Sequence, residues 1–131
     1  MIKMLQQIPP QIEKAKNYLV IVEGKKDKAA MEHLGFKRVF MIHETGKSIG
    51  EKVEEIQELC SKKDRVCILT DFDKKGKQMY LLLKSKLAEA GVKLDNSLRA
   101  FLLGEKISHI EGLSHFLENG EIRTNRRHNQ N

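Results

Sequence analysis

The sequence contains two related stretches, LVIVEG at residues 19–24 and VCILTDFD at residues 66–73. Each is a short apolar run, rich in β-branched residues, that ends on acidic residues. An apolar run without alternating polar positions is typical of a strand buried on both faces, as in a parallel sheet. Two other runs have the same character, so the sequence predicts about four strands. The predicted strands are Tyr18–Val22, Val39–Ile42, Val66–Leu69 and Leu98–Leu103.

Charged amphipathic stretches separate the predicted strands. Apolar residues recur in them at helical spacing, as Val53, Ile56 and Cys60 do. Gly35 and Gly91 follow two of these stretches, where a left-handed helix end favours glycine. The alternation predicts an α/β fold, a mostly parallel sheet with helices on both faces. The predicted helices are Lys26–Leu34, Ser48–Cys60 and Lys75–Ala90.

The length of 131 residues corresponds to one domain. Before the first strand, Pro9-Pro10 is expected to open a short helix through Lys16, which gives a helical extension over residues 1–17. We expect the α/β domain over residues 18–118, with a last helix at Gly112–Leu117. Residues 119–131 are polar and are expected to form a disordered tail.

The composition favours a cytoplasmic protein without membrane contact. Hydrophobic residues make up 40% of the chain and charged residues 32%, and no apolar stretch approaches the roughly 20 residues that cross a bilayer. The N-terminus lacks the apolar core of a secretory signal. Cys60 and Cys67 form neither a CxxC motif nor a zinc-ligand spacing, so we expect both to be reduced and packed.

Acidic residues follow two of the predicted strands where ligands bind to parallel sheets, beyond the carboxyl ends. Glu23 follows the first strand, and Asp71 and Asp73 follow the third, two residues apart and so on the same side. Three converging carboxylates would repel one another unless a hard cation neutralised them, and oxygen ligands suit Mg²⁺, or Mn²⁺ in its place. The number of ions, one or two, stays open. The alternative is that the aspartates only cap the next helix.

Lysines follow both acidic motifs and would place positive charge for phosphate groups beside the ion. The net charge of +6 agrees with a polyanionic partner, although lysine runs also form ordinary solvated helix faces. Gly24 and Gly76 would allow close backbone approach at the two turns. The candidate phosphate-binding residues are Lys25, Lys26, Lys28, Lys74, Lys75 and Lys77.

The ordered pair of motifs, VIVEG and then LTDFDKKG with its first aspartate 48 residues after Glu23, resembles the Toprim domain. The resemblance runs from about Leu19 to Leu103. Toprim domains occur in topoisomerases, bacterial-type primases, recombination-repair factors and certain nucleases. The resemblance implies a compact Rossmann-like parallel sheet, a divalent metal held by Glu23, Asp71 and Asp73, and chemistry at phosphodiester bonds. It gives the same three residues the catalytic roles, with Glu23 also a general acid or base.

Missing features narrow the choice within this resemblance. The chain has no separate domain carrying a nucleophilic tyrosine, no further nucleotide-binding domain and no zinc motif. The chain is similar to small stand-alone Toprim proteins, whose relatives include the ribonuclease that matures 5S ribosomal RNA. We therefore expect a metal-dependent nuclease, with structured RNA favoured over DNA as its substrate. The alternative is a non-catalytic nucleic-acid-binding or assembly module that keeps the metal site. A homodimer or protein partner is compatible with either.

Two further motifs keep more than one interpretation. Thr45-Gly46-Lys47-Ser48 resembles the end of a phosphate-binding P-loop but lacks its first glycine, and Ser48 with Glu51 also fits a helix capping box. His109 and Glu111 follow the fourth predicted strand, so either could reach the substrate, or Glu111 could complement a helix dipole.

Overall fold

Three parallel strands form the sheet, in the order β2-β1-β3. The computed structural model describes residues 9–43, 46–105 and 110. The central strand pairs on both edges, so Leu19 lies opposite Arg38 on one side and Val66 on the other. The elements are α1 (Pro10–Ala15), β1 (Leu19–Val22), α2 (Lys25–His33), β2 (Arg38–Met41), α3 (Ile49–Leu59), β3 (Val66–Ile68), α4 (Lys74–Glu89) and α5 (Ser97–Gly104).

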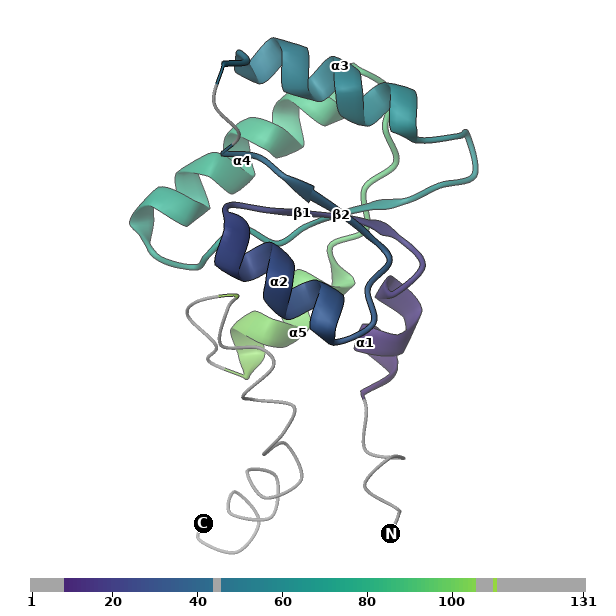
Figure 1. Ribbon diagram of the computed structural model, residues 1–131, viewed down its shortest axis with the longest axis vertical. Coiled ribbons are helices and arrows are strands. Elements are labelled where there is room, and N and C mark those ends of the chain that lie inside the picture. The colour runs from purple at the N-terminus through teal and green to yellow at the C-terminus, as the bar shows by residue number, and fades with distance from the viewer. Residues whose placement is uncertain (1–8, 44–45, 106–109, 111–131) are drawn as a thin grey trace, which may run out of the picture.

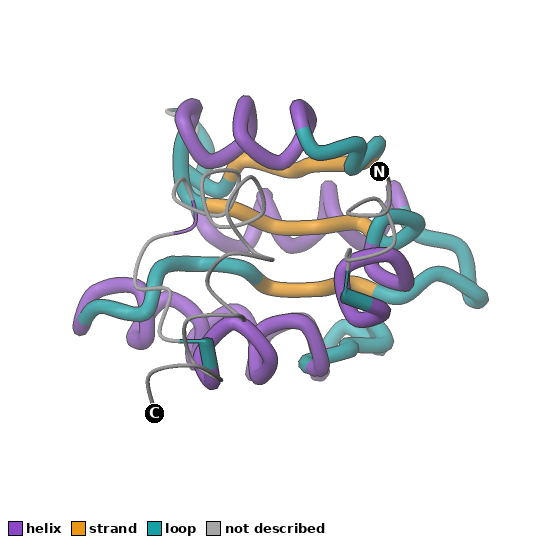
Figure 2. Tube along the Cα trace, turned by 90° about the horizontal axis from the view of Figure 1, so that it is seen from below, coloured by secondary structure: helices purple, strands orange, loops and turns teal. Residues whose placement is uncertain are grey.

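Helices cover both faces of the sheet (Figures 1 and 2). On β1, Val20 and Val22 point into a core shared with α1, α2 and α5, whereas Leu19 and Ile21 point into a core shared with α3 and α4. All four residues of β1 are buried because both faces are covered. This explains the unbroken apolar run. The predicted α/β fold with a parallel sheet is confirmed.

The helix ends follow the predicted local rules. Gly35 and Gly91 have φ angles of 99° and 82°, in the left-handed region that favours glycine. The Ser48 side chain accepts a hydrogen bond from the Glu51 N–H, and the Glu51 carboxylate accepts one from the Ser48 N–H. Lys47 pairs with Glu55 at 2.9 Å. The capping-box interpretation of Ser48 and Glu51 is therefore confirmed.

The fourth predicted strand, Leu98–Leu103, is wrong, because this segment is helix α5. Leu98 and Leu102 are buried and Phe101 packs beside them, whereas Leu103 is 55% exposed. Residues spaced by three and four positions share one face of a helix, and leucine and alanine favour helices over strands. Only a single bridge continues the sheet within the described residues, between Val66 and Leu94, just before α5.

The bridge leads into a set of contacts around Asp95. Its carboxylate accepts hydrogen bonds from the Tyr18 hydroxyl at 3.1 Å and the Ser97 N–H at 2.9 Å, and Lys14 lies 3.8 Å away. Burial alone would raise the pKa of Asp95, but these hydrogen bonds and the lysine outweigh it and lower the pKa. The contacts tie α1, the start of β1 and the start of α5 together.

Replacing Asp95 by Asn should make the free energy of unfolding less dependent on pH in the acidic range. Folding lowers the pKa of Asp95. The contribution of Asp95 to stability is therefore complete above the unfolded-state pKa of about 3.9, and it is lost as pH falls through the lower folded-state pKa. We expect Asp95→Asn to lower the free energy of unfolding by about 2 kcal/mol near neutral pH, with a smaller deficit at about pH 2. Urea unfolding of both proteins at the two pH values measures this, with Glu54→Gln on the exposed face of α3 as control. An equal deficit at both pH values would contradict the assignment.

Both cysteines are free thiols. Cys67 lies fully buried in β3, and burial raises its pKa to about 12. Cys60 is half-buried at the end of α3, and burial raises its pKa too. The expectation of packed, reduced cysteines is confirmed.

Several predictions fall on other parts of the chain. His109, Glu111, the helix predicted at Gly112–Leu117 and the tail at 119–131 lie outside the described residues. Within the described residues, no helix is both long enough and apolar enough to span a bilayer.

Candidate metal centre

Glu23 and Asp71 meet at the carboxyl edge of the sheet. Glu23 directly follows β1, and Asp71 follows β3 after two residues that continue along the sheet, where the Leu69 N–H donates to the Ile21 carbonyl at 2.7 Å. The Asp71 N–H donates to Oε2 of Glu23 at 2.8 Å. Two residues 48 positions apart in the chain are therefore in direct contact, because parallel neighbouring strands end at the same edge.

The Asp71 side chain is held from the other side. Its Oδ1 accepts a hydrogen bond from the backbone N–H of Ile110 at 2.7 Å, and Ile110 is fully buried in the core shared with α5. Each carboxylate therefore has one oxygen fixed by a backbone amide. The other oxygens, Oε1 of Glu23 and Oδ2 of Asp71, accept no hydrogen bond from any described residue. Both side chains are half-buried.

Asp73 has a different local role. It is the N-cap of α4, and its Oδ1 accepts a hydrogen bond from the Gly76 N–H at 2.8 Å. This hydrogen bond is the helix-capping contact that the alternative interpretation of Asp73 predicts. Across residues 9–43, 46–105 and 110, no three or more His, Cys, Asp or Glu side chains are grouped so as to hold a metal ion. The structure therefore places the Asp71 backbone against the Glu23 carboxylate, whereas Asp73 caps the start of α4.

The donor chemistry of the pair suits Mg²⁺. Magnesium is commonly held in proteins by one or two carboxylates, with waters and substrate phosphates completing the octahedral shell. Glu23 and Asp71 each present one carboxylate oxygen that no described residue occupies, at the sheet edge where parallel folds bind ligands. A site of this kind needs no complete protein cage.

Gly76 lets α4 begin directly against the Asp71 peptide. A Cβ at this position would lie 2.0 Å from the Asp71 carbonyl oxygen, far inside van der Waals contact. The Thr70 hydroxyl, fully buried, donates to the Gly76 carbonyl at 2.7 Å and fixes the same approach. Gly24 differs, because a Cβ there would meet nothing within 4 Å. Instead, its N–H donates to the buried carboxylate of Asp27 at 3.0 Å.

Three buried charged residues around this edge were not predicted from the sequence. Arg99 on α5 binds the backbone of the loop that carries Asp71. Lys52 on α3 donates to the Ile42 carbonyl at the end of β2. Asp27 closes the turn after Glu23. Of the three, Asp27 had a readable local signal, an acid three residues after a helix-starting glycine. The partners of Arg99 and Lys52 are remote backbone carbonyls, which no local pattern reveals.

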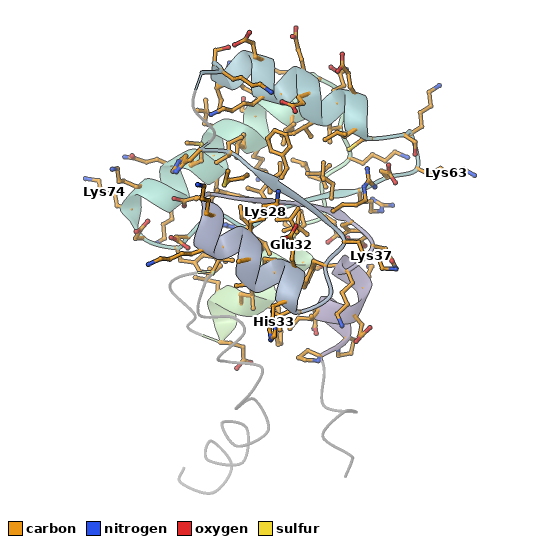
Figure 3. All side chains as sticks on the ribbon, in the orientation of Figure 1. Lys28, Glu32, His33, Lys37, Lys63 and Lys74 are labelled. Carbon is orange, nitrogen blue, oxygen red and sulfur yellow. The ribbon has the colours of Figure 1, made fainter. Side chains whose placement is uncertain are left out.

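The predicted lysines lie on the first turns of α2 and α4, which both begin at the carboxyl edge (Figure 1). Lys74 projects from this end of the molecule and Lys63 from the opposite end (Figure 3). No ion pair joins any of the six to a described residue, so their charge is not neutralised within this part of the chain. All are exposed except Lys28, which is half-buried: Lys25, Lys26, Lys28, Lys74, Lys75 and Lys77.

Comparisons with known proteins show the family of the chain. The family model of the Toprim domain matches residues 18–102. A solved structure of a protein from Aquifex aeolicus is similar, with 29% sequence identity, a TM-score of 0.64, and 77% of this chain and 93% of that chain covered. None of the curated proteins compared with the chain matches it. The chain therefore belongs to the Toprim family, whose metal-binding domains are found in nucleases and primases.

Proposed function

We propose that this protein is a Mg²⁺-dependent nuclease that hydrolyses phosphodiester bonds of nucleic acid, with structured RNA ahead of DNA as substrate. The observation that supports the proposal is the hydrogen bond from the Asp71 N–H to the Glu23 carboxylate at 2.8 Å, which joins the two acidic residues at the sheet edge, and each carboxylate keeps one oxygen that no described residue contacts. Glu23, Asp71 and Asp73 would hold one or two ions, Mn²⁺ replacing Mg²⁺ in experiments.

The residues divide the work between binding and chemistry. A bound Mg²⁺ would polarise the scissile phosphate and lower the pKa of a coordinated water. The lysines at the starts of α2 and α4 would bind the phosphates on either side of the reacting one. Glu23 would accept the proton of the attacking water or protonate the leaving oxygen, according to where the phosphate lies.

A second candidate has a specific observation in its favour. Within the described residues the three carboxylates do not form a three-ligand group, and Asp73 caps α4. A module that binds nucleic acid through its lysines without cleaving it would need no such group. The two functions differ in turnover and share salt-dependent binding.

The test is incubation with labelled structured RNA, single-stranded DNA and double-stranded DNA, with Mg²⁺ or Mn²⁺. The control is the double variant Asp71→Asn, Asp73→Asn, which keeps a capping side chain at the start of α4. Metal-dependent cleavage absent from the control supports the nuclease and identifies its substrate. Binding without cleavage favours the module, and cleavage that survives in the control contradicts the site.

The lysines have a separate test. A triple glutamine variant of α4 should weaken nucleic-acid binding and reduce the slope of log affinity against log salt by about one for each phosphate that the variant no longer binds. A triple variant at the opposite end should leave the slope unchanged. Equal slopes for the two variants would contradict the proposed surface. The two sets are Lys74, Lys75 and Lys77, and Lys62, Lys63 and Lys93.

A further inference from the structure

Arg99 is a buried cation attached to the loop that carries the acidic pair. Its side chain lies on the inner face of α5, and the residue is only 7% exposed. The guanidinium donates to the carbonyls of Thr70 at 2.7 Å and Asp71 at 3.3 Å, with a longer contact to Ile68 at 3.4 Å. One side chain therefore fixes the backbone from the end of β3 to the first aspartate.

Two aromatic rings hold the guanidinium in place. Its central carbon lies 4.5 Å from the centre of the Phe72 ring and 4.2 Å from the centre of the Tyr80 ring. A planar guanidinium can contact rings while its in-plane N–H groups bond elsewhere. Phe72 sits between the two aspartates and Tyr80 is on α4, so the group also joins the acidic loop to the helix behind it.

The contacts continue from Arg99 to both carboxylates. The Arg99 guanidinium donates to the Asp71 carbonyl, and the N–H of Asp71 donates to the Glu23 carboxylate. The Asp71 side chain in turn accepts from Ile110, which lies six residues beyond the end of α5. A shift of the Asp71 peptide would therefore move the Glu23 contact and the Asp71 carboxylate together.

We propose that Arg99 is a positioning residue that sets the separation and orientation of Glu23 and Asp71 for the divalent cation. The inference rests on the proposed function, since it assigns a role toward the ion that the carboxylate pair would hold. Arg99 acts through the backbone and touches no reacting atom.

The charge of Arg99 and its geometry have opposite consequences for metal binding. A nearby positive charge repels a divalent cation, so simple charge removal would tighten binding. Lysine keeps the charge but cannot span two carbonyls as a fork. Arg99→Lys therefore isolates the positioning effect from the charge effect.

The experiment measures Mn²⁺ affinity by electron paramagnetic resonance and backbone amide exchange in the metal-free protein. In Arg99→Lys we expect Mn²⁺ affinity to fall about tenfold, as happens when a metal ligand loses the group that orients it. The amides of Asp71 and Ile110 should exchange about tenfold faster relative to that of Val66, at the other end of the sheet. The matched control is Arg38→Lys, because the Arg38 guanidinium of the wild type also binds a carbonyl, that of Leu59, at the distant end of the sheet. In this variant both the Mn²⁺ affinity and the amide exchange rates should stay within about twofold of the wild type.

The outcomes separate the inference from the proposed function. A folded Arg99→Lys protein that binds Mn²⁺ like the wild type overturns the positioning role, and so does faster exchange of all amides alike with metal affinity unchanged. If Arg99→Lys does not fold, Tyr80→Leu replaces it, with Tyr80→Phe as the control that keeps the ring. Leucine at position 80 should weaken Mn²⁺ binding, and equal affinities overturn the inference. Wild-type protein that binds no Mn²⁺, or binds it equally in Asp71→Asn, overturns the proposed metal centre itself and the inference with it.

Discussion

Replacing Asp71 by Asn should reduce metal-dependent cleavage about a thousandfold, a loss of about 4 kcal/mol in transition-state stabilisation. Asparagine has nearly the same shape and can still accept the hydrogen bond from Ile110, but it removes the negative charge that would hold the ion. Affinity for nucleic acid should change by less than about threefold, because the lysines bind the phosphates. Single-turnover cleavage and equilibrium binding of the same labelled RNA measure the two effects separately.

Two variants serve as controls for this prediction. Asp64→Asn removes a carboxylate at the opposite end of the sheet, where it pairs with Arg38 at 3.2 Å, and should keep wild-type turnover. Asp73→Asn keeps a good N-cap while removing the third carboxylate charge, so any loss of turnover there reports the charge rather than the helix. Equal turnover in Asp71→Asn and wild type would contradict the assignment of the acidic pair.

Replacing Gly76 by Ala should destabilise the protein by about 3 kcal/mol, which corresponds to roughly 10–20 °C in Tm for a domain of this size. In a helix alanine is normally the better residue by about 1 kcal/mol. The sign is reversed here because the added Cβ would lie 2.0 Å from the Asp71 carbonyl oxygen, so either α4 or the acidic loop must move. Thermal unfolding measures the loss, and the shift should also weaken Mn²⁺ binding.

Gly50 provides the matched control, since it also lies in the first turn of a helix. A Cβ there would meet only Ser48 Oγ, at 3.8 Å, an ordinary contact. Gly50→Ala should therefore leave stability unchanged or raise it by about 0.5–1 kcal/mol. A Gly76→Ala protein as stable as Gly50→Ala would contradict the close packing of α4 against the acidic loop.

The parts of the fold that depend on neighbouring residues alone could be predicted from the sequence. The apolar run at residues 19–22 is buried on both faces, and the Ser48 cap and the Gly35 turn follow from rules that involve only neighbouring residues. The segment 98–103 could not be assigned by the same reasoning, because a short apolar run fits a buried strand or a buried helix. Its leucines and alanine, rather than β-branched residues, were the signal for a helix.

The candidate site could be predicted only where the chain order fixes the geometry. Parallel strands bring their carboxyl ends to one edge, so Glu23 and Asp71 could be placed at the same edge from their positions, but only the strand order β2-β1-β3 makes them neighbours. The hydrogen bonds of Arg99 depend on tertiary packing of α5 against the acidic loop. Arg99 lies 28 residues beyond Asp71 in the chain. Arg99 is a charged residue inside an apolar run, which is unusual and could have indicated a buried role. Its partners are backbone carbonyls, which have no sequence signature.

A Mn²⁺ titration of the wild-type protein and of the double variant Glu23→Gln, Asp71→Asn, followed by electron paramagnetic resonance, tests whether these two residues hold the ion. We predict saturable binding of one or two ions per chain in the wild type and its loss in the double variant, with both proteins folded by circular dichroism. Binding of the same stoichiometry and affinity in the two proteins would contradict a metal centre at the Glu23–Asp71 pair.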